Sequence, residues 1–175
     1  MLPKTYAWLG SEPGPMMLVE ALRHHGVRER AGSASNPAIL AWAAELGLAE
    51  AYRADATPWC GLFLGLVAHR TGKPQPAAPL WALSWAAWEE PAPVPMLGDV
   101  LVFRRPGGGH VGLYAGEDGE AYHVLGGNQG DRVSIARLAK ARLAAARHPR
   151  WRGTMPATRR RVVLSAAGAL SRNER

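Results

Sequence analysis

The sequence predicts an α+β fold, with helices in the first half of the chain and an antiparallel β-sheet in the second. Three stretches have the apolar spacing of helices: residues 15–25, 36–46 and 57–70. After Pro91 the pattern changes to short apolar runs separated by turn residues, as at 117–120. Because the two patterns are grouped rather than alternating, we expect N-terminal helices packed on an antiparallel sheet.

Capping residues set the expected helix starts. Asn36-Pro37 is typical of an N-cap followed by the first helical position. Thr57-Pro58 has the same form and places Cys60 at about the third position of the next helix. Further elements are expected as follows: a short aromatic helix at 80–88, strands at 100–103, 110–115, 121–125 and 132–135, a basic helix at 137–147, and a last strand at 151–155.

Composition limits the class of protein. The chain has 175 residues, 47% of them apolar, so we expect one domain over residues 1–157, followed by a basic tail at 158–175. The net charge of +7 suits anionic partners such as nucleic acid, membrane lipid or acidic polymers of a bacterial envelope. We find neither a secretory signal at the start nor an apolar run of about 18 residues that would span a membrane.

Cys60 is the single cysteine, so an internal disulfide is excluded. A lone cysteine is often a buried structural residue. Near a helix start, however, unpaired N–H groups and the helix dipole favour the thiolate. We therefore interpret Cys60 as a candidate nucleophile.

A cysteine nucleophile needs a base and a group that orients the base. Of the six histidines, four are expected to be solvated or capping residues: His24, His25, His69 and His148. His110 follows three glycines and opens an apolar strand, which makes it the candidate base. Asn128 is the favoured orienting residue, although a turn asparagine would look the same. His123 is a cross-strand neighbour or an alternative third residue.

These motifs resemble a known family. The pieces are Pro58-Trp59-Cys60, Gly98-Asp99-Val100, Gly109-His110-Val111-Gly112 and Leu125-Gly126-Gly127-Asn128-Gln129. In this order they resemble the CHAP (cysteine/histidine-dependent amidohydrolase/peptidase) group over roughly residues 5–155. They are most similar to small phage- and prophage-associated members of the papain-like superfamily, which are related to the NlpC peptidases.

The resemblance implies a papain-like fold and a catalytic triad of Cys60, His110 and Asn128. Many CHAP domains carry an acidic residue two positions before the asparagine, where this chain has Gly126. Trp59, Trp85 and Gln129 are expected along the substrate groove, although core packing is the preferred interpretation for the Trp81, Trp85 and Trp88 run. No cofactor and no metal are expected.

The implied function is hydrolysis of a peptidoglycan amide in a stem peptide, a cross-bridge or the muramoyl-alanine link, through a thioester. The expected partners are peptidoglycan, an anionic envelope surface, and a holin or a phage-like particle; nucleic acid is not expected. The protein would be made in the cytoplasm and act in the periplasm or cell wall. The alternatives are a non-catalytic module that binds wall polymer or polyanion, and an acyltransferase that uses the same thioester.

Overall fold

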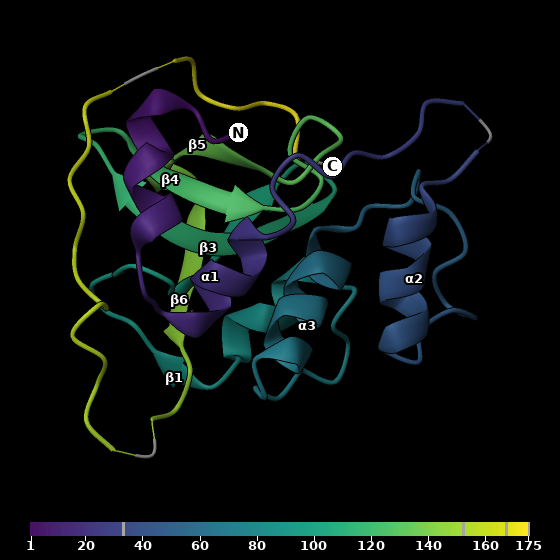
Figure 1. The fold of residues 1–175 in the computed structure, drawn as a ribbon, viewed down its shortest axis with the longest axis horizontal. Coiled ribbons are helices and arrows are strands. Elements are labelled where there is room, and N and C mark those ends of the chain that lie inside the picture. The colour runs from purple at the N-terminus through teal and green to yellow at the C-terminus, as the bar shows by residue number, and fades with distance from the viewer. Residues whose placement is uncertain (33, 152, 167, 175) are drawn as a thin grey trace.

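The computed structural model describes residues 1–32, 34–151, 153–166 and 168–174. It confirms the α+β class, with helices first and an antiparallel sheet after them (Figure 1). The helical elements are the 3₁₀ helices η1 (Lys4–Ser11), η2 (Ala82–Ala87) and η3 (Lys140–Arg142), and the α-helices α1 (Met16–Leu22), α2 (Pro37–Glu45) and α3 (Cys60–Arg70). Asn36 caps α2 as expected, because its Oδ1 accepts from the Ala38 N–H at 2.9 Å.

The strands form one antiparallel sheet in the order β1-β6-β2-β3-β4-β5. Their bounds are β1 (Glu90–Pro91), β2 (Val100–Arg105), β3 (Gly108–Glu117), β4 (Ala121–Gly126), β5 (Ser134–Ala139) and β6 (Leu143–His148). The register pairs Phe103 with His110 and Leu113 with Leu125. The strand order places β3, the strand of His110, between β2 and β4 in the interior of the sheet.

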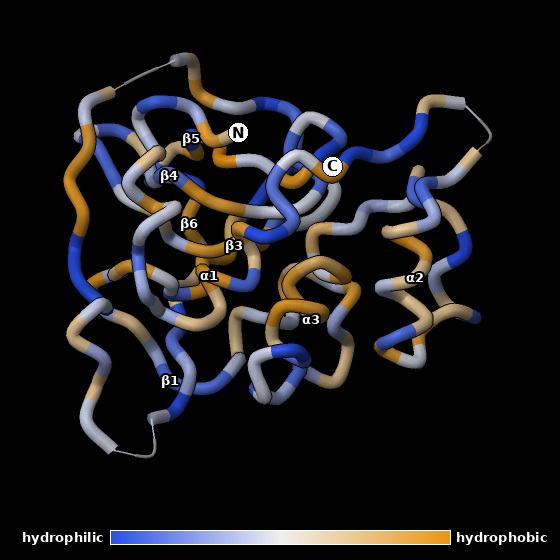
Figure 2. The backbone as a smooth tube through the Cα atoms, viewed as in Figure 1, coloured by the Kyte–Doolittle hydropathy of each residue, from blue (hydrophilic) through white to orange (hydrophobic). Residues whose placement is uncertain are grey.

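The two faces of the sheet carry different cores. The larger core lies between the sheet and the helices, where Val111 and Leu113 pack with the apolar side chains of α3. Figure 2 shows α3 as a hydrophobic segment, and residues 60–68 are all buried. A smaller cluster on the other face contains Phe103, Tyr114 and Val124. Because side chains alternate along a strand, His110 belongs to the face of Phe103.

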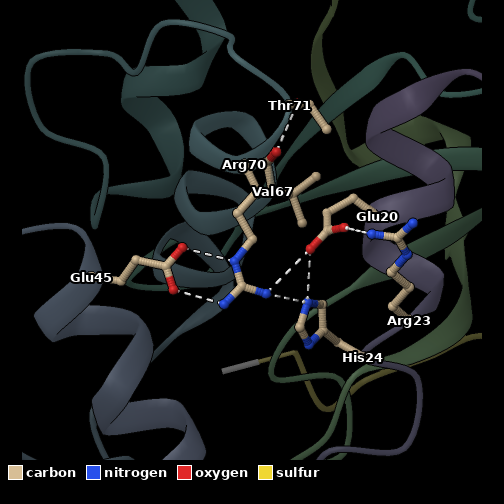
Figure 3. Close-up of polar contacts among 7 residues, drawn as sticks. All are labelled: Glu20, Arg23, His24, Glu45, Val67, Arg70 and Thr71. Atoms are coloured by element: carbon tan, nitrogen blue, oxygen red, sulfur yellow. Dashed lines mark hydrogen bonds and ion pairs between the residues drawn. The ribbon is translucent and has the colours of Figure 1, made fainter.

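A polar cluster fixes the end of α3 against α1 and α2 (Figure 3). The Arg70 guanidinium donates to both carboxylate oxygens of Glu45 at 2.8 and 2.7 Å, and to Glu20 Oε1 at 3.3 Å. Glu20 is buried and also accepts from Arg23 and contacts His24. A bidentate guanidinium pair of this kind sets orientation as well as contributing energy. It holds α3 at a fixed angle to its neighbours.

The segment after residue 157 packs on the same body. Arg159 forms a bidentate ion pair with buried Asp99, with both hydrogen bonds 2.7 Å long. Glu117 and Leu164 are joined by a backbone hydrogen bond of 2.8 Å, and Glu174 is buried beside Arg142. The basic tail thus contributes buried contacts to the fold.

Several expected elements differ in the structure. Residues 137–147 are the end of β5, η3 and most of β6, so the predicted helix is wrong. The expected strand at 151–155 includes residue 152, which lies outside the described residues, and the other four form no strand. The helix expected at 57–70 begins at Cys60, with Trp59 as its N-cap. Within the described residues, none of the helices is long and apolar enough to cross a membrane.

Candidate active site at the start of helix α3

Cys60 is the first residue of α3, two positions nearer the helix start than the sequence predicts. Pro58 precedes the N-cap, and the first helical hydrogen bond runs from the Phe63 N–H to the Trp59 carbonyl at 2.9 Å. Glycine is required next to the thiol, because a Cβ on Gly61 would lie 2.4 Å from the Pro79 carbonyl oxygen. The loop 79–80 therefore runs directly over the helix start and forms one wall beside Cys60.

The Cys60 thiol is buried, with 3% of the residue exposed. Burial raises the pKa of the Cys60 thiol, because the thiolate would lose hydration. The backbone N–H groups of Val111 and Gly61 bind the sulfur and lower that pKa, as does the positive charge of Arg105. The effect of burial on the pKa of Cys60 is larger than the effects of the helix start that lower it. The resting group is the neutral thiol.

His110 is completely buried in the adjacent strand β3. Its imidazole Nε2 lies 3.0 Å from Gln129 Oε1. The Gln129 amide nitrogen donates to the carbonyls of Val124 and Ser134 at 3.0 and 2.5 Å, which fixes the amide with its oxygen toward His110. Since Gln129 Oε1 can only accept, Nε2 must carry the proton and Nδ1 must present a lone pair.

The environment keeps this imidazole neutral. Burial lowers the pKa of His110 to about 4, because the imidazolium would be desolvated. The hydrogen bond with Gln129 and the carboxylate of Glu174 act in the opposite direction, while Arg142 and Arg105 lower the pKa further. The orphan Nδ1 is buried and makes no hydrogen bond within the described part of the chain. His110 is therefore a neutral imidazole with an unused acceptor.

The structure brings Cys60 to the strand of His110. The backbone N–H of Val111 is one of the groups that lower the pKa of the Cys60 thiol, so the sulfur lies near the peptide group that joins His110 to Val111. Across the ranges that the structure describes, no hydrogen bond connects the thiol with the imidazole. Cys60 belongs to the core on the helix face, with Val111, whereas the His110 side chain lies on the opposite face with Phe103. The structure therefore brings the thiol to the strand of His110 but not to its imidazole, which is oriented by a third residue.

That third residue is Gln129, where the sequence favoured Asn128. Asn128 adopts a left-handed backbone conformation, with φ of 57°, and makes no side-chain hydrogen bond to His110 in the described chain. This is the turn-asparagine alternative. Gln129 can reach His110 because residue 126 is a glycine. A Cβ at that position would lie 3.0 Å from Gln129 Oε1 and 3.3 Å from His110 Nε2. The Gln129 amide fills the space that a side chain at 126 would need.

His123 belongs to a separate buried network. Its Nε2 lies 2.8 Å from Asp118 Oδ2, and its Nδ1 lies 2.7 Å from the Tyr6 hydroxyl. Arg137 donates to the same Asp118 oxygen at 2.7 Å. These contacts occupy both ring nitrogens of His123. It therefore does not orient His110.

A cleft of about 260 Å³ opens beside Cys60. Its walls come from the loop before α3, the loop 80–82 and the hairpin after β2; they include Tyr52, Thr57, Trp81, Arg105 and Gly109. Trp81 is 59% exposed, whereas Trp59, Trp85 and Gln129 are buried. The groove residues expected from the sequence thus lie behind the cleft, and Trp81 forms its aromatic wall.

The described residues contain no group of three or more His, Cys, Asp or Glu side chains arranged to hold a metal ion. A scan against protein-family models finds no match, and no curated protein matches the sequence. The interpretation of the site therefore depends on its own geometry and on the motif resemblance.

Proposed function

We propose that this protein is a cysteine hydrolase of the CHAP and NlpC type, with a papain-like fold, that cleaves an amide bond of peptidoglycan. The observation that carries the proposal is that a cysteine at a helix start lines a cleft and lies against the strand that holds an oriented histidine. Cys60 begins a buried helix and lines a cleft. On the strand that the Cys60 sulfur contacts, His110 is held by Gln129 in the tautomer with a free Nδ1 lone pair. A neutral thiol and a neutral, oriented imidazole are the protonation states that a Cys–His pair needs before proton transfer.

In the proposed reaction, Nδ1 of His110 takes the proton of the Cys60 thiol, and the thiolate attacks the amide carbonyl carbon. In the structure the imidazole lies on the Phe103 face of the sheet and the thiol on the Val111 face, so the transfer requires His110 to change its side-chain position until it reaches the thiol. The Cys60 N–H at the helix start donates to the developing oxyanion. The imidazolium then gives its proton to the leaving amine, and a thioester remains. Water, deprotonated by His110, releases the acid and regenerates the thiol.

Gln129 replaces Asn128 as the orienting residue in this proposal. An amide oxygen suffices for that task, because its role is to bind the Nε2 proton and to fix the ring. No carboxylate at position 126 is required, since the Gln129 amide occupies that space.

The decisive experiment is digestion of purified peptidoglycan, followed by mass spectrometry of the released muropeptides. We expect defined amide-cleavage products from the wild type and none from Cys60→Ala, which removes only the sulfur atom. His69→Ala, a change at the exposed end of α3, is the matched control and should retain activity. Equal digestion by the wild type and Cys60→Ala would overturn the proposal.

One observation favours the non-catalytic alternative. The described residues hold the thiol and the imidazole without a direct hydrogen bond, and burial raises the pKa of the Cys60 thiol. A module that binds wall polymer through its net charge of +7 would show salt-sensitive binding. It would also leave Cys60 inert to iodoacetamide at neutral pH. Binding without any cleavage product would establish this alternative.

A further inference from the structure

Arg105 stands at the end of β2, where the chain turns into the glycine loop. Its Nε donates to the Gly109 carbonyl at 3.1 Å, and this bond holds the guanidinium against the hairpin. The side chain lines the same cleft as Cys60. Its charge reaches the sulfur, since it is one of the groups that lower the pKa of Cys60.

The charge of Arg105 has no acidic partner within residues 1–32, 34–151, 153–166 and 168–174. Many other arginines of this chain do have one, including Arg142, Arg159 and Arg160. Glu174, which lines a neighbouring cavity together with Arg105, is already bound through both oxygens by Arg142, at 3.3 and 2.8 Å. Arg105 therefore keeps donors free for a ligand.

No acidic residue lines the cleft, whose other residues are aromatic, aliphatic, proline and glycine residues together with Thr57 and Cys60. A guanidinium in such surroundings favours a planar anion that it can bind through two hydrogen bonds. The carboxylate is the anion that peptides offer. A cleft of this composition would reject a substrate that places a positive charge at the same position.

We propose that Arg105 binds a carboxylate of the substrate beside the amide that Cys60 attacks. This inference rests on the proposed function, and it narrows the substrate class to peptides with a free carboxylate next to the scissile amide. In wall peptides such groups occur on a side-chain-linked acidic residue or on a terminal residue. Peptides in which that carboxylate is converted to a carboxamide are poor substrates.

The test uses pairs of synthetic stem peptides that differ only in carboxylate or carboxamide at one position. The wild type should cleave one carboxylate form about 10- to 100-fold faster than its carboxamide, the range expected for a hydrogen-bonded charged group. Arg105→Gln should abolish the preference by slowing the carboxylate form alone. Arg105→Lys should restore part of it. Arg104→Gln is the matched control, because Arg104 is exposed on the same strand and does not line the cleft.

A binding measurement separates this inference from the proposed function. Cys60→Ala should bind the carboxylate peptide more tightly than the carboxamide in calorimetry, and the double variant with Arg105→Gln should bind both equally. Cleavage of both forms at equal rates by the wild type would overturn the inference and leave the hydrolase intact. Absence of all cleavage, with the binding preference retained, would overturn the hydrolase and leave the carboxylate site intact.

Discussion

The imidazole Nε2 of His110 and the amide oxygen of Gln129 lie 3.0 Å apart in the core of the protein. The amide cannot turn around, because its nitrogen donates to two backbone carbonyls. One side chain therefore decides which nitrogen of the histidine carries the proton. The tautomer and the pKa of His110 should therefore respond to changes in the residues around it.

Gln129→Ala should remove both the acceptor for His110 and the donors for Val124 and Ser134. Buried groups left without partners cost about 1–3 kcal/mol each, so we expect a clear loss in the free energy of unfolding. The imidazole should also lose its single tautomer, which nitrogen NMR shifts report directly. Gln129→Glu keeps an acceptor for Nε2 and should keep the tautomer, although it is also destabilised. A single Nε2-protonated form in Gln129→Ala would contradict this account.

The stability of the protein should depend on pH through His110. The pKa of His110 in the folded protein is about 4, below the usual value of about 6.5. At a pH between these two values, the imidazole is protonated in the unfolded chain and neutral in the folded chain. The neutral imidazole thus contributes stability that is fully present above about pH 6.5 and is lost as the pH falls toward 4. The size of this contribution is about 3 kcal/mol.

Urea unfolding of the wild type and His110→Gln at several pH values checks this dependence. The difference in unfolding free energy between the two proteins should fall as the pH is lowered from 7 to 4. Parallel pH profiles for the two proteins would show that His110 is not buried as a neutral group.

Glu174→Gln should lower the pKa of His110 further, because it removes a nearby negative charge and leaves Arg142 without its partner. Arg142→Gln should shift that pKa upward. Titration of the His110 ring protons by NMR measures both changes without any assay of activity. Glu120→Gln, at an exposed carboxylate, is the control and should leave the titration unchanged. An unchanged titration in Glu174→Gln would mean that the segment near residue 174 does not act on the site.

Arg159→Leu should destabilise the protein by about 3–5 kcal/mol, because it leaves Asp99 buried and without its ion-pair partner. Arg160→Leu is the comparison, since its ion pair with Glu12 is partly exposed. We expect that change to cost no more than about 1 kcal/mol. Chemical denaturation of both variants would decide whether the tail is part of the fold; equal losses would argue against it.

The sequence predicts those features that depend on local chemistry. Asn36 and Pro37 indicate the start of α2 because capping and the fixed backbone of proline act within a few residues. The helix expected at 137–147 is absent because the structure of this segment is set by residues that are distant in the sequence. Its alanine, leucine and arginine residues favour a helix, but His123 pairs with Arg137 and Leu101 pairs with Ala146 across the sheet. Tertiary pairing overrides local propensity here.

Tertiary structure also decides which of two adjacent residues orients His110, a choice that the sequence alone does not determine. Asn128 and Gln129 are adjacent amides, and the pattern cannot tell which of them reaches His110. The choice follows from the left-handed backbone at Asn128 and from the lack of a side chain at Gly126. A Gly-Gly turn followed by two amides indicates the place of the interaction, and the turn geometry selects the partner.

The position of β6 has a consequence for biosynthesis. This strand is the last of the six along the chain, yet it lies between β1 and β2 and supplies the pairing partner of β1. In a ribosome-bound chain that ends before residue 148, the edge of β2 that pairs with β6 therefore lacks its full partner strand. The residues of α3, including Cys60, have already been synthesised at that point. Contacts between distant segments form slowly and leave strand edges exposed until they close. The sheet behind the cleft is completed only after the nascent chain has passed its final strand.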